Sequence, residues 1–234
     1  MKKIWTLILI LPGFLLNAQN YYRIRADITV KKKYADGKYT LNKGTIYYDN
    51  ITGKMVSDMW FPYKETYVMI KNHTYYIKNG QLMASMKNPM PPETTIFALL
   101  LKNNIQYYGL ENSGYKLTNV EEDGGLVIST WEPPQNLEKA VGKILIANKN
   151  GLIHGIIFYN IEGKIVSKQF FEDYQNIQGI MFPRRMVQFF YDEQGNETIQ
   201  KTEFKNIIID EKDNDNFYNF PIEHYLQNTG ASTR

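Results

Sequence analysis

The clearest regularity in the sequence is a strict alternation of apolar and polar residues over positions 22–31. Successive side chains of a β-strand point to opposite faces of a sheet, so a period of two residues indicates a strand with one buried and one wet face. This segment is therefore predicted to be a half-buried strand. Its apolar set is Tyr22, Ile24, Ala26, Ile28 and Val30, and its polar set is Arg23, Arg25, Asp27, Thr29 and Lys31.

The same organisation recurs along the chain. Asp36-Gly37 predicts a hairpin turn into a second strand at residues 39–48. Further turns that contain Gly separate short apolar runs, and the 18 Tyr and 12 Phe residues favour strands. Short strands joined by close turns indicate an antiparallel meander or barrel. The runs lie at residues 67–77, 126–131, 143–147, 153–159, 185–191 and 198–204.

One segment, residues 93–102, departs from the strand pattern. It follows Pro91-Pro92, has Glu93 in its first turn and ends at Lys102, which are signals for the start and the end of a helix. An apolar stripe along it must be buried against a sheet face. The sequence therefore predicts one short helix between two sets of strands. The stripe consists of Ile96, Phe97, Leu100 and Leu101.

Residues 1–18 predict a cleaved secretory signal peptide. Lys2 and Lys3 precede an apolar stretch at residues 4–16, and the small residue Ala18 follows. The alternative, an uncleaved membrane helix, is disfavoured because such a span needs about 20 apolar residues. With no Cys, the chain also lacks an acylation site at the cleavage point. We expect a soluble, non-lipidated periplasmic protein with one domain at residues 19–226 and a polar, disordered tail at residues 227–234.

Charge argues against nucleic acid as a partner. Loss of the signal peptide lowers the net charge from +3 to about +1, and no basic stripe remains to bind phosphate backbones. No disulfide framework exists without Cys, but a domain of this length can bury a sufficient core.

Catalytic and metal-binding patterns are missing from the sequence. His73, His154 and His224 do not stand at zinc-ligand spacing, and neither the serine-hydrolase nor the phosphate-loop motif occurs. The acidic segment 210–216 suggests a calcium loop, but Phe217 and Tyr218 occupy positions that need a ligand and Gly. We therefore expect a non-enzymatic protein without metal or cofactor.

Several segments together resemble the periplasmic outer-membrane lipoprotein carriers, the LolA-like proteins. Gly44-Thr45-Ile46 is similar to the early strand of that family, residues 55–62 to the next strand, and residues 95–100 to its central helix. Residues 206–210, followed by Phe220-Pro221, resemble its closing stretch. The resemblance implies an α+β fold, mainly antiparallel β: a curved half-open β-barrel with one or a few short helices capping the concave face.

The resemblance also implies a site. In the family, inward-facing side chains line a cavity for acyl chains, and the corresponding residues here are Ile46, Met55, Met59, Phe97 and Leu100. The chain departs from the family in two ways. Asp49-Asn50 stands where the carriers have an arginine that holds the lid, and no room remains for a helix before the first strand.

These observations leave two functions open. The first is a monomeric, non-catalytic periplasmic carrier or binding module for an acyl chain, a lipid or a lipoprotein. The second is a protein-interaction or sensor module of the cell envelope with the same fold, whose interior is filled by its own side chains and which has a protein partner instead of a lipid cargo.

Overall fold

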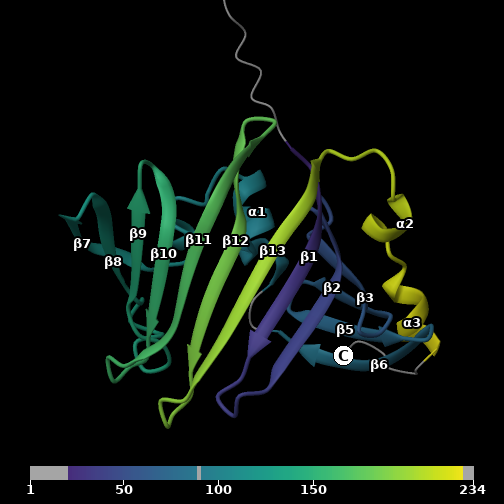
Figure 1. Ribbon diagram of the computed structural model, residues 1–234, viewed down its shortest axis with the longest axis horizontal. Helices are drawn as coiled ribbons and strands as arrows, with labels where there is room; N and C mark the ends of the chain where they lie inside the picture. The colour runs from purple at the N-terminus through teal and green to yellow at the C-terminus, as the bar shows by residue number, and fades with distance from the viewer. Residues whose placement is uncertain (1–20, 89–90, 229–234) are drawn as a thin grey trace, which may run out of the picture.

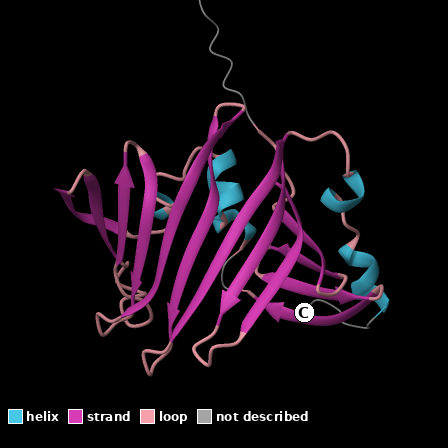
Figure 2. Cartoon of the chain, in the orientation of Figure 1, coloured by secondary structure: helices cyan, strands magenta, loops and turns pink. Residues whose placement is uncertain are grey.

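The computed structural model describes residues 21–88 and 91–228, so the predicted signal peptide lies outside the described residues. The described chain forms a 13-stranded antiparallel sheet in the order β6-β5-β4-β3-β2-β1-β13-β12-β11-β10-β9-β8-β7 (Figures 1 and 2). Its strands are β1 (Arg23–Lys33), β2 (Tyr39–Asp49), β3 (Lys54–Phe61), β4 (Glu65–Ile70), β5 (His73–Lys78), β6 (Gln81–Lys87), β7 (Lys116–Asp123), β8 (Leu126–Glu132), β9 (Ile144–Lys149), β10 (Leu152–Tyr159), β11 (Ile165–Ile177), β12 (Ile180–Tyr191) and β13 (Glu197–Ile209).

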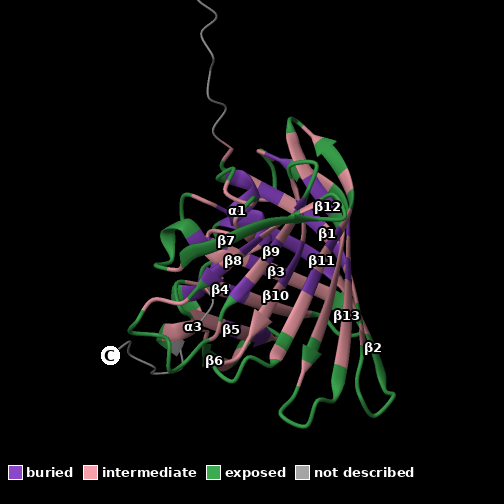
Figure 3. Cartoon of the chain, turned by 90° about the vertical axis from the view of Figure 1, so that its left-hand side faces the viewer, coloured by how far each residue is buried: buried purple, intermediate pink, exposed green. Residues whose placement is uncertain are grey.

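The sheet is curved and remains open, because its edge strands β6 and β7 do not pair with each other. The first and last strands of the sequence, β1 and β13, pair at its centre, where Ile28 lies opposite Phe204. The chain passes from one edge to the other through the helix α1 (Ile96–Leu101), which lies inside the curve (Figures 1 and 3). This arrangement confirms the predicted curved half-open barrel with a helix on its concave face.

The predicted helix at residues 93–102 is divided into two short helices. A 3₁₀ helix, η1 (Pro92–Thr94), is followed by Thr95 in an extended conformation, with a ψ of 157°, and then by α1. All six residues of α1 are buried. Phe97 packs between Phe182 of β12 and Phe204 of β13, with ring centroids 5.9 and 5.6 Å away. The apolar stripe is therefore buried against the centre of the sheet, as predicted.

Alternation along the strands produces two cores, one on each face of the sheet. Ile46 and Tyr48 of β2 belong to the concave core with α1, whereas Tyr47, which lies between them, belongs to a second core on the opposite face. Two helices that the sequence did not predict cover this opposite face, α2 (Asp215–Tyr218) and α3 (Ile222–Asn228). Phe217 of α2 stacks on Tyr47 at 4.5 Å. Helix α3 includes the first two residues of the predicted tail, and residues 229–234 lie outside the described residues.

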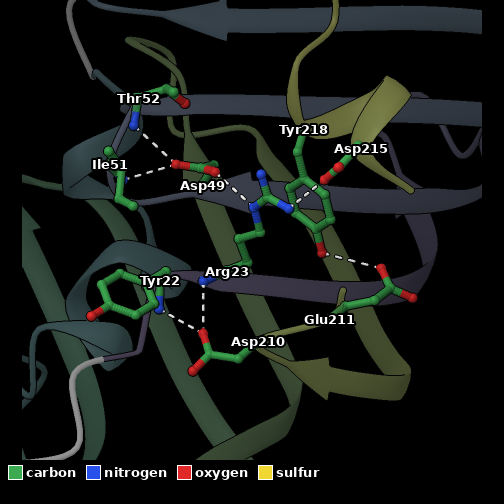
Figure 4. Close-up of polar contacts among 9 residues, drawn as sticks. All are labelled: Tyr22, Arg23, Asp49, Ile51, Thr52, Asp210, Glu211, Asp215 and Tyr218. Atoms are coloured by element: carbon green, nitrogen blue, oxygen red, sulfur yellow. Dashed lines mark hydrogen bonds and ion pairs between the residues drawn. The ribbon is translucent and has the colours of Figure 1, made fainter. Parts of the chain in front are cut away.

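An ionic cluster holds α2 to the start of β1 (Figure 4). Arg23 makes ion pairs with Asp49 at 2.9 Å and with Asp215 of α2 at 2.6 Å, and its guanidinium lies 4.6 Å from the ring centroid of Tyr218. The Tyr218 hydroxyl donates to Glu211 at 3.3 Å. Asp49 stands where the family resemblance placed an arginine, so the charges here are arranged differently from those expected for a carrier lid.

Candidate apolar binding face

The five residues predicted to line a cavity gather around one core. Ile46 on β2 and Phe97 and Leu100 on α1 belong to the concave core, and Met55 and Met59 on β3 are half-buried and pack against it. The exposed fractions of Ile46, Phe97 and Leu100 are 8, 3 and 4%, so these side chains mainly fill the interior. The two methionines are the members of this set that reach towards solvent.

Strand register extends the surface beyond Met55. Met55 on β3 lies opposite Met69 on β4, Met69 lies opposite Thr74 on β5, and Thr74 lies opposite Met86 on β6. Because side chains of opposed residues share a face, these four residues form a row across the sheet, which we call the methionine row. Val68 and Ile70, on either side of Met69, contact the opposite core, which places the row on the concave face.

The methionine row becomes more exposed towards the edge of the sheet. Met55 and Met69 are half-buried, and Met86 on the edge strand is 51% exposed. Met69 was not among the predicted site residues. It lies in the run 67–77, where apolar and polar residues do not alternate regularly. The sequence therefore could not indicate which face of the sheet Met69 occupies.

Polar groups lie beside the methionine row. The register places Tyr67 opposite Tyr76, with ring centroids 5.1 Å apart, and Glu65 opposite Lys78. Glu65 accepts hydrogen bonds from the hydroxyls of Tyr67 at 3.0 Å and Tyr76 at 2.9 Å, and it pairs with Lys78 at 2.8 Å. On the concave face, Tyr67 and Tyr76 therefore stand two residues from the methionine row on β4 and β5, and the Glu65–Lys78 pair stands four residues from it.

These contacts determine how the polar groups ionise. The hydrogen bond from Lys78, followed by those from the two tyrosines, holds the pKa of Glu65 below its ordinary value. Burial, together with the neighbouring Glu65 carboxylate, raises the pKa of Tyr67 to about 12. Near neutral pH the site therefore has a carboxylate, an ammonium group and protonated phenols, which can donate and accept hydrogen bonds.

The backbone of β2 at Gly44 approaches Met59 closely. Gly44 on β2 lies opposite Met59 across a register shift at Lys43/Gly44. A Cβ added to Gly44 would lie 2.6 Å from both the Met59 Sδ and the Asp58 carbonyl oxygen, which is closer than van der Waals contact allows. Gly44, which the family resemblance singled out, thus provides space for the methionine side chain.

The three histidines are dispersed over the chain. His73 stacks on Tyr75, His154 contacts Phe170, and His224 contacts Tyr225. Within residues 21–88 and 91–228, no three His, Cys, Asp or Glu side chains group closely enough to hold a metal ion. No helix in this part of the chain has both the length and the apolar character needed to cross a bilayer.

Comparisons with known proteins identify the fold. No protein-family description and no curated protein matches the sequence. Solved structures do match. A LolA superfamily protein from Nitrosomonas europaea is 11% identical with a TM-score of 0.57, and the match covers 84% of this chain and 90% of that one. A DUF1329 family protein from Desulfovibrio piger is 12% identical with a TM-score of 0.58 and coverages of 85 and 90%.

A third similar structure is described as a putative outer-membrane lipoprotein-sorting protein domain, from Vibrio parahaemolyticus. It is 12% identical with a TM-score of 0.60, and the match covers 86% of this chain and 91% of that one. Similarity at this level of identity, over nearly the whole of both chains, shows a common architecture. The chain therefore has the LolA-like fold that the sequence motifs indicated.

Proposed function

We propose that this protein is a periplasmic binding module that holds an acyl chain, as part of a lipid or a lipoprotein, against the concave face of β3 to β6. The methionine row is the observation that carries this proposal. It consists of three methionines and one threonine and is partly open to solvent in a LolA-like fold. Unbranched, polarisable methionine side chains adapt to loosely shaped apolar ligands.

The polar groups beside the row suit the other end of such a ligand. Lys78, Glu65 and the two phenols offer hydrogen-bond donors and acceptors on the same concave face as Met55, Met59 and Met69. A lipid has both an apolar chain and a polar head, and this face has both kinds of surface. Burial of about 0.8 kcal/mol per methylene over a dozen methylenes would exceed the roughly 8 kcal/mol of micromolar binding before association costs are subtracted.

The remaining parts of the proposal follow from the sequence. The signal peptide predicted at residues 1–18 supports a periplasmic location. The absence of a nucleophile motif from the sequence supports a non-catalytic role, and we propose a monomer that acts as a carrier. The lipoprotein-sorting description of the Vibrio parahaemolyticus structure is consistent with this class of cargo.

Two variants on one strand test the proposal. Met86→Glu places a charge on the methionine row, whereas Met83→Glu places the same charge outside it, and the two side chains are 51 and 55% exposed. Binding of a fluorescent fatty acid should weaken at least tenfold in Met86→Glu and stay within twofold of the wild type in Met83→Glu. Native mass spectrometry of protein purified from a lipid-containing host should detect a bound lipid. A ligand-free spectrum together with no binding of the fatty acid would overturn the proposal.

A second candidate function, a protein-interaction or sensor module with a filled interior, is favoured by one observation. The six residues of α1 are all buried, and Phe97 packs between two rings at the centre of the concave face. Met59→Glu separates the two functions. If the protein is a carrier, the variant should lose binding of the fatty acid and keep its circular dichroism spectrum. If the interior is filled by side chains, the variant should unfold because the new charge is buried.

A further inference from the structure

Two neighbouring turns carry most of the exposed aromatic side chains. Within residues 21–88 and 91–228, seven Phe, Trp and Tyr side chains are at least 36% exposed, and five of them lie at the β1–β2 and β3–β4 turns. The exposed fractions are 36% for Tyr34, 70% for Tyr39, 57% for Trp60, 42% for Phe61 and 64% for Tyr63. Exposed apolar groups gathered in this way, with polar groups around them, mark a contact surface.

Lysine side chains stand among these rings. Residues 31–43 contain five lysines and a single carboxylate, Asp36, which is paired with Lys38. Residues 60–64 add Lys64. We call residues 31–43 and 60–64 together the lysine–aromatic rim. Its formal charge is +5, from six lysines and one carboxylate.

Contacts between lysines and rings join the two turns into one surface. Strand register places Lys43 of β2 opposite Phe61 of β3, and Lys43 Nζ lies 5.8 Å from the ring centroid of Trp60 and 5.9 Å from that of Phe61. Lys33 Nζ lies 5.9 Å from the ring centroid of Tyr39. An ammonium group within about 6 Å of a ring centroid is attracted to the face of the ring. The rim therefore holds charge and aromatic surface side by side.

The opposite end of the central strands has a different charge. The β1–β2 hairpin is at the bottom of Figure 1, and residues 210–215 lead into α2 near the top right. These residues contain four carboxylates and one lysine, and Arg23 and Arg25 pair with Asp215 at 2.6 Å and Glu211 at 3.9 Å. An anionic surface therefore attracts the end of the protein that carries the lysine–aromatic rim.

We propose that the lysine–aromatic rim docks on the surface of a lipid bilayer that carries anionic headgroups. Trp and Tyr have an apolar body and a polar tip, which suit the headgroup level of a bilayer, and Lys can bury its stem while its charge stays at the phosphates. Each lysine near an anionic surface strengthens binding about fivefold.

A bilayer fits the rim better than an acidic protein does. An acidic protein surface would match the charge of the lysines but would place the exposed rings against polar groups. The interface of a bilayer has anionic headgroups and an apolar layer directly below them, so it matches both kinds of side chain. No residue of the rim belongs to the methionine row, and the proposal does not depend on the acyl-binding function.

Trp60 provides a direct measurement of docking. The mature chain contains two tryptophans, because Trp5 lies in the predicted signal peptide, and Trp131 is only 4% exposed. A shift of the tryptophan emission to shorter wavelength therefore reports Trp60. Vesicles of equal parts phosphatidylglycerol and phosphatidylcholine should cause this shift and co-sediment the protein. Vesicles of phosphatidylcholine alone should bind at least tenfold more weakly, and about 1 M salt should weaken binding to the anionic vesicles by a similar factor.

Two pairs of charge reversals locate the contact. Lys33→Glu/Lys64→Glu changes two exposed lysines of the rim, whereas Lys102→Glu/Lys212→Glu makes the same change of net charge at exposed lysines outside it. The first pair should weaken binding to the anionic vesicles at least twentyfold, and the second should stay within threefold of the wild type. Equal losses in the two pairs would show that overall charge carries the binding and would overturn the proposal.

A pair of tyrosine variants tests the rings separately from the charges. Tyr39→Ser removes a ring of the rim that is 70% exposed, and Tyr22→Ser removes one at the opposite end of β1 that is 49% exposed. The first should weaken vesicle binding at least threefold, and the second should leave it unchanged. A loss in Tyr22→Ser as large as that in Tyr39→Ser would contradict the assignment of the surface.

The remaining outcomes concern the identity of the partner. Equal binding to anionic and neutral vesicles would overturn the proposal, as would no binding to either, which is the result expected if the rim binds an acidic protein. Met86→Glu lies outside the rim and should bind vesicles within threefold of the wild type even if it no longer binds the fatty acid. A loss of vesicle binding in Met86→Glu as large as in Lys33→Glu/Lys64→Glu would place the contact on the methionine row and overturn the docking surface.

Discussion

The Arg23 Nε atom lies 2.9 Å from Asp49 Oδ2, which connects the start of β1 to the end of β2. The Asp49 side chain is 3% exposed, and its other oxygen accepts hydrogen bonds from the backbone N–H groups of Ile51 and Thr52, both at 2.9 Å (Figure 4). Because Arg23 also reaches Asp215 on α2, one guanidinium joins the central strands to helix α2 on the opposite face.

Removing the Asp49 carboxylate should destabilise the fold. Asp49→Ala leaves Arg23 and two backbone N–H groups without their acceptor, and Arg23 is itself partly exposed, so we expect a loss of about 2–3 kcal/mol in the free energy of unfolding. Asp36→Ala is the control, since its ion pair with Lys38 lies in an exposed turn. That variant should lose much less stability, because an ion pair between exposed side chains is screened by solvent. Urea denaturation measures both, and equal losses would contradict the prediction.

The contribution of Asp49 should depend on pH. Burial alone would raise the pKa of Asp49, but the hydrogen bonds from Thr52, Arg23 and Ile51 outweigh it and hold the pKa below its ordinary value. On acidification the unfolded chain therefore takes up this proton first, near its ordinary pKa of about 3.9, and proton binding favours unfolding. The stabilisation is complete above that pH and is lost as the pH falls through the lower pKa of the folded state.

The difference in unfolding free energy between the wild type and Asp49→Asn measures this effect. It should be constant from about pH 7 to pH 5 and should shrink towards pH 3 as the wild-type carboxylate is protonated. A difference that grew on acidification would show that the pKa of Asp49 is raised in the folded protein.

Adding a methyl group at Gly44 should disturb both stability and the candidate site. The new Cβ would meet Met59 Sδ and the Asp58 carbonyl oxygen at 2.6 Å, so we expect Gly44→Ala to cost about 2–3 kcal/mol and to displace Met59. Gly155→Ala meets its nearest atoms at 3.1 and 3.2 Å and should cost less. Thermal denaturation ranks the stability of the two variants. A smaller loss of stability for Gly44→Ala than for Gly155→Ala would show that β3 moves away from the new methyl group without strain.

Truncating Phe97 should test how firmly α1 fills the concave face. Phe97→Ala removes a ring that contacts Phe182 and Phe204, and we expect a loss of about 3–5 kcal/mol. A double-mutant cycle with Phe204→Ala should give a coupling of about 0.5–1.5 kcal/mol beyond area burial. Leu117→Ala, at an exposed position on β7, serves as the control. A small loss for Phe97→Ala, near that of the control, would mean that α1 leaves the sheet easily.

Local sequence patterns determined the strands and the central helix. The alternation at residues 22–31 identified β1 and its buried face, because the two-residue period of a strand is a property of neighbouring residues alone. The same applies to the apolar stripe of α1 and to the turn at Gly37. Glu65 and Lys78, by contrast, are 13 residues apart in sequence, and only the pairing of β4 with β5 brings them together.

Tertiary structure decided the rest. Val68, Met69 and Ile70 are all apolar, so their composition could not reveal which one faces the concave side, and pairing with Met55 placed Met69 there. Helices α2 and α3 are too short to be stable alone and exist because they pack on Tyr47 and its neighbours. The lysine–aromatic rim is likewise a consequence of pairing between distant segments, since Lys43 and Phe61 are far apart in sequence and only the register of β2 with β3 places them opposite each other.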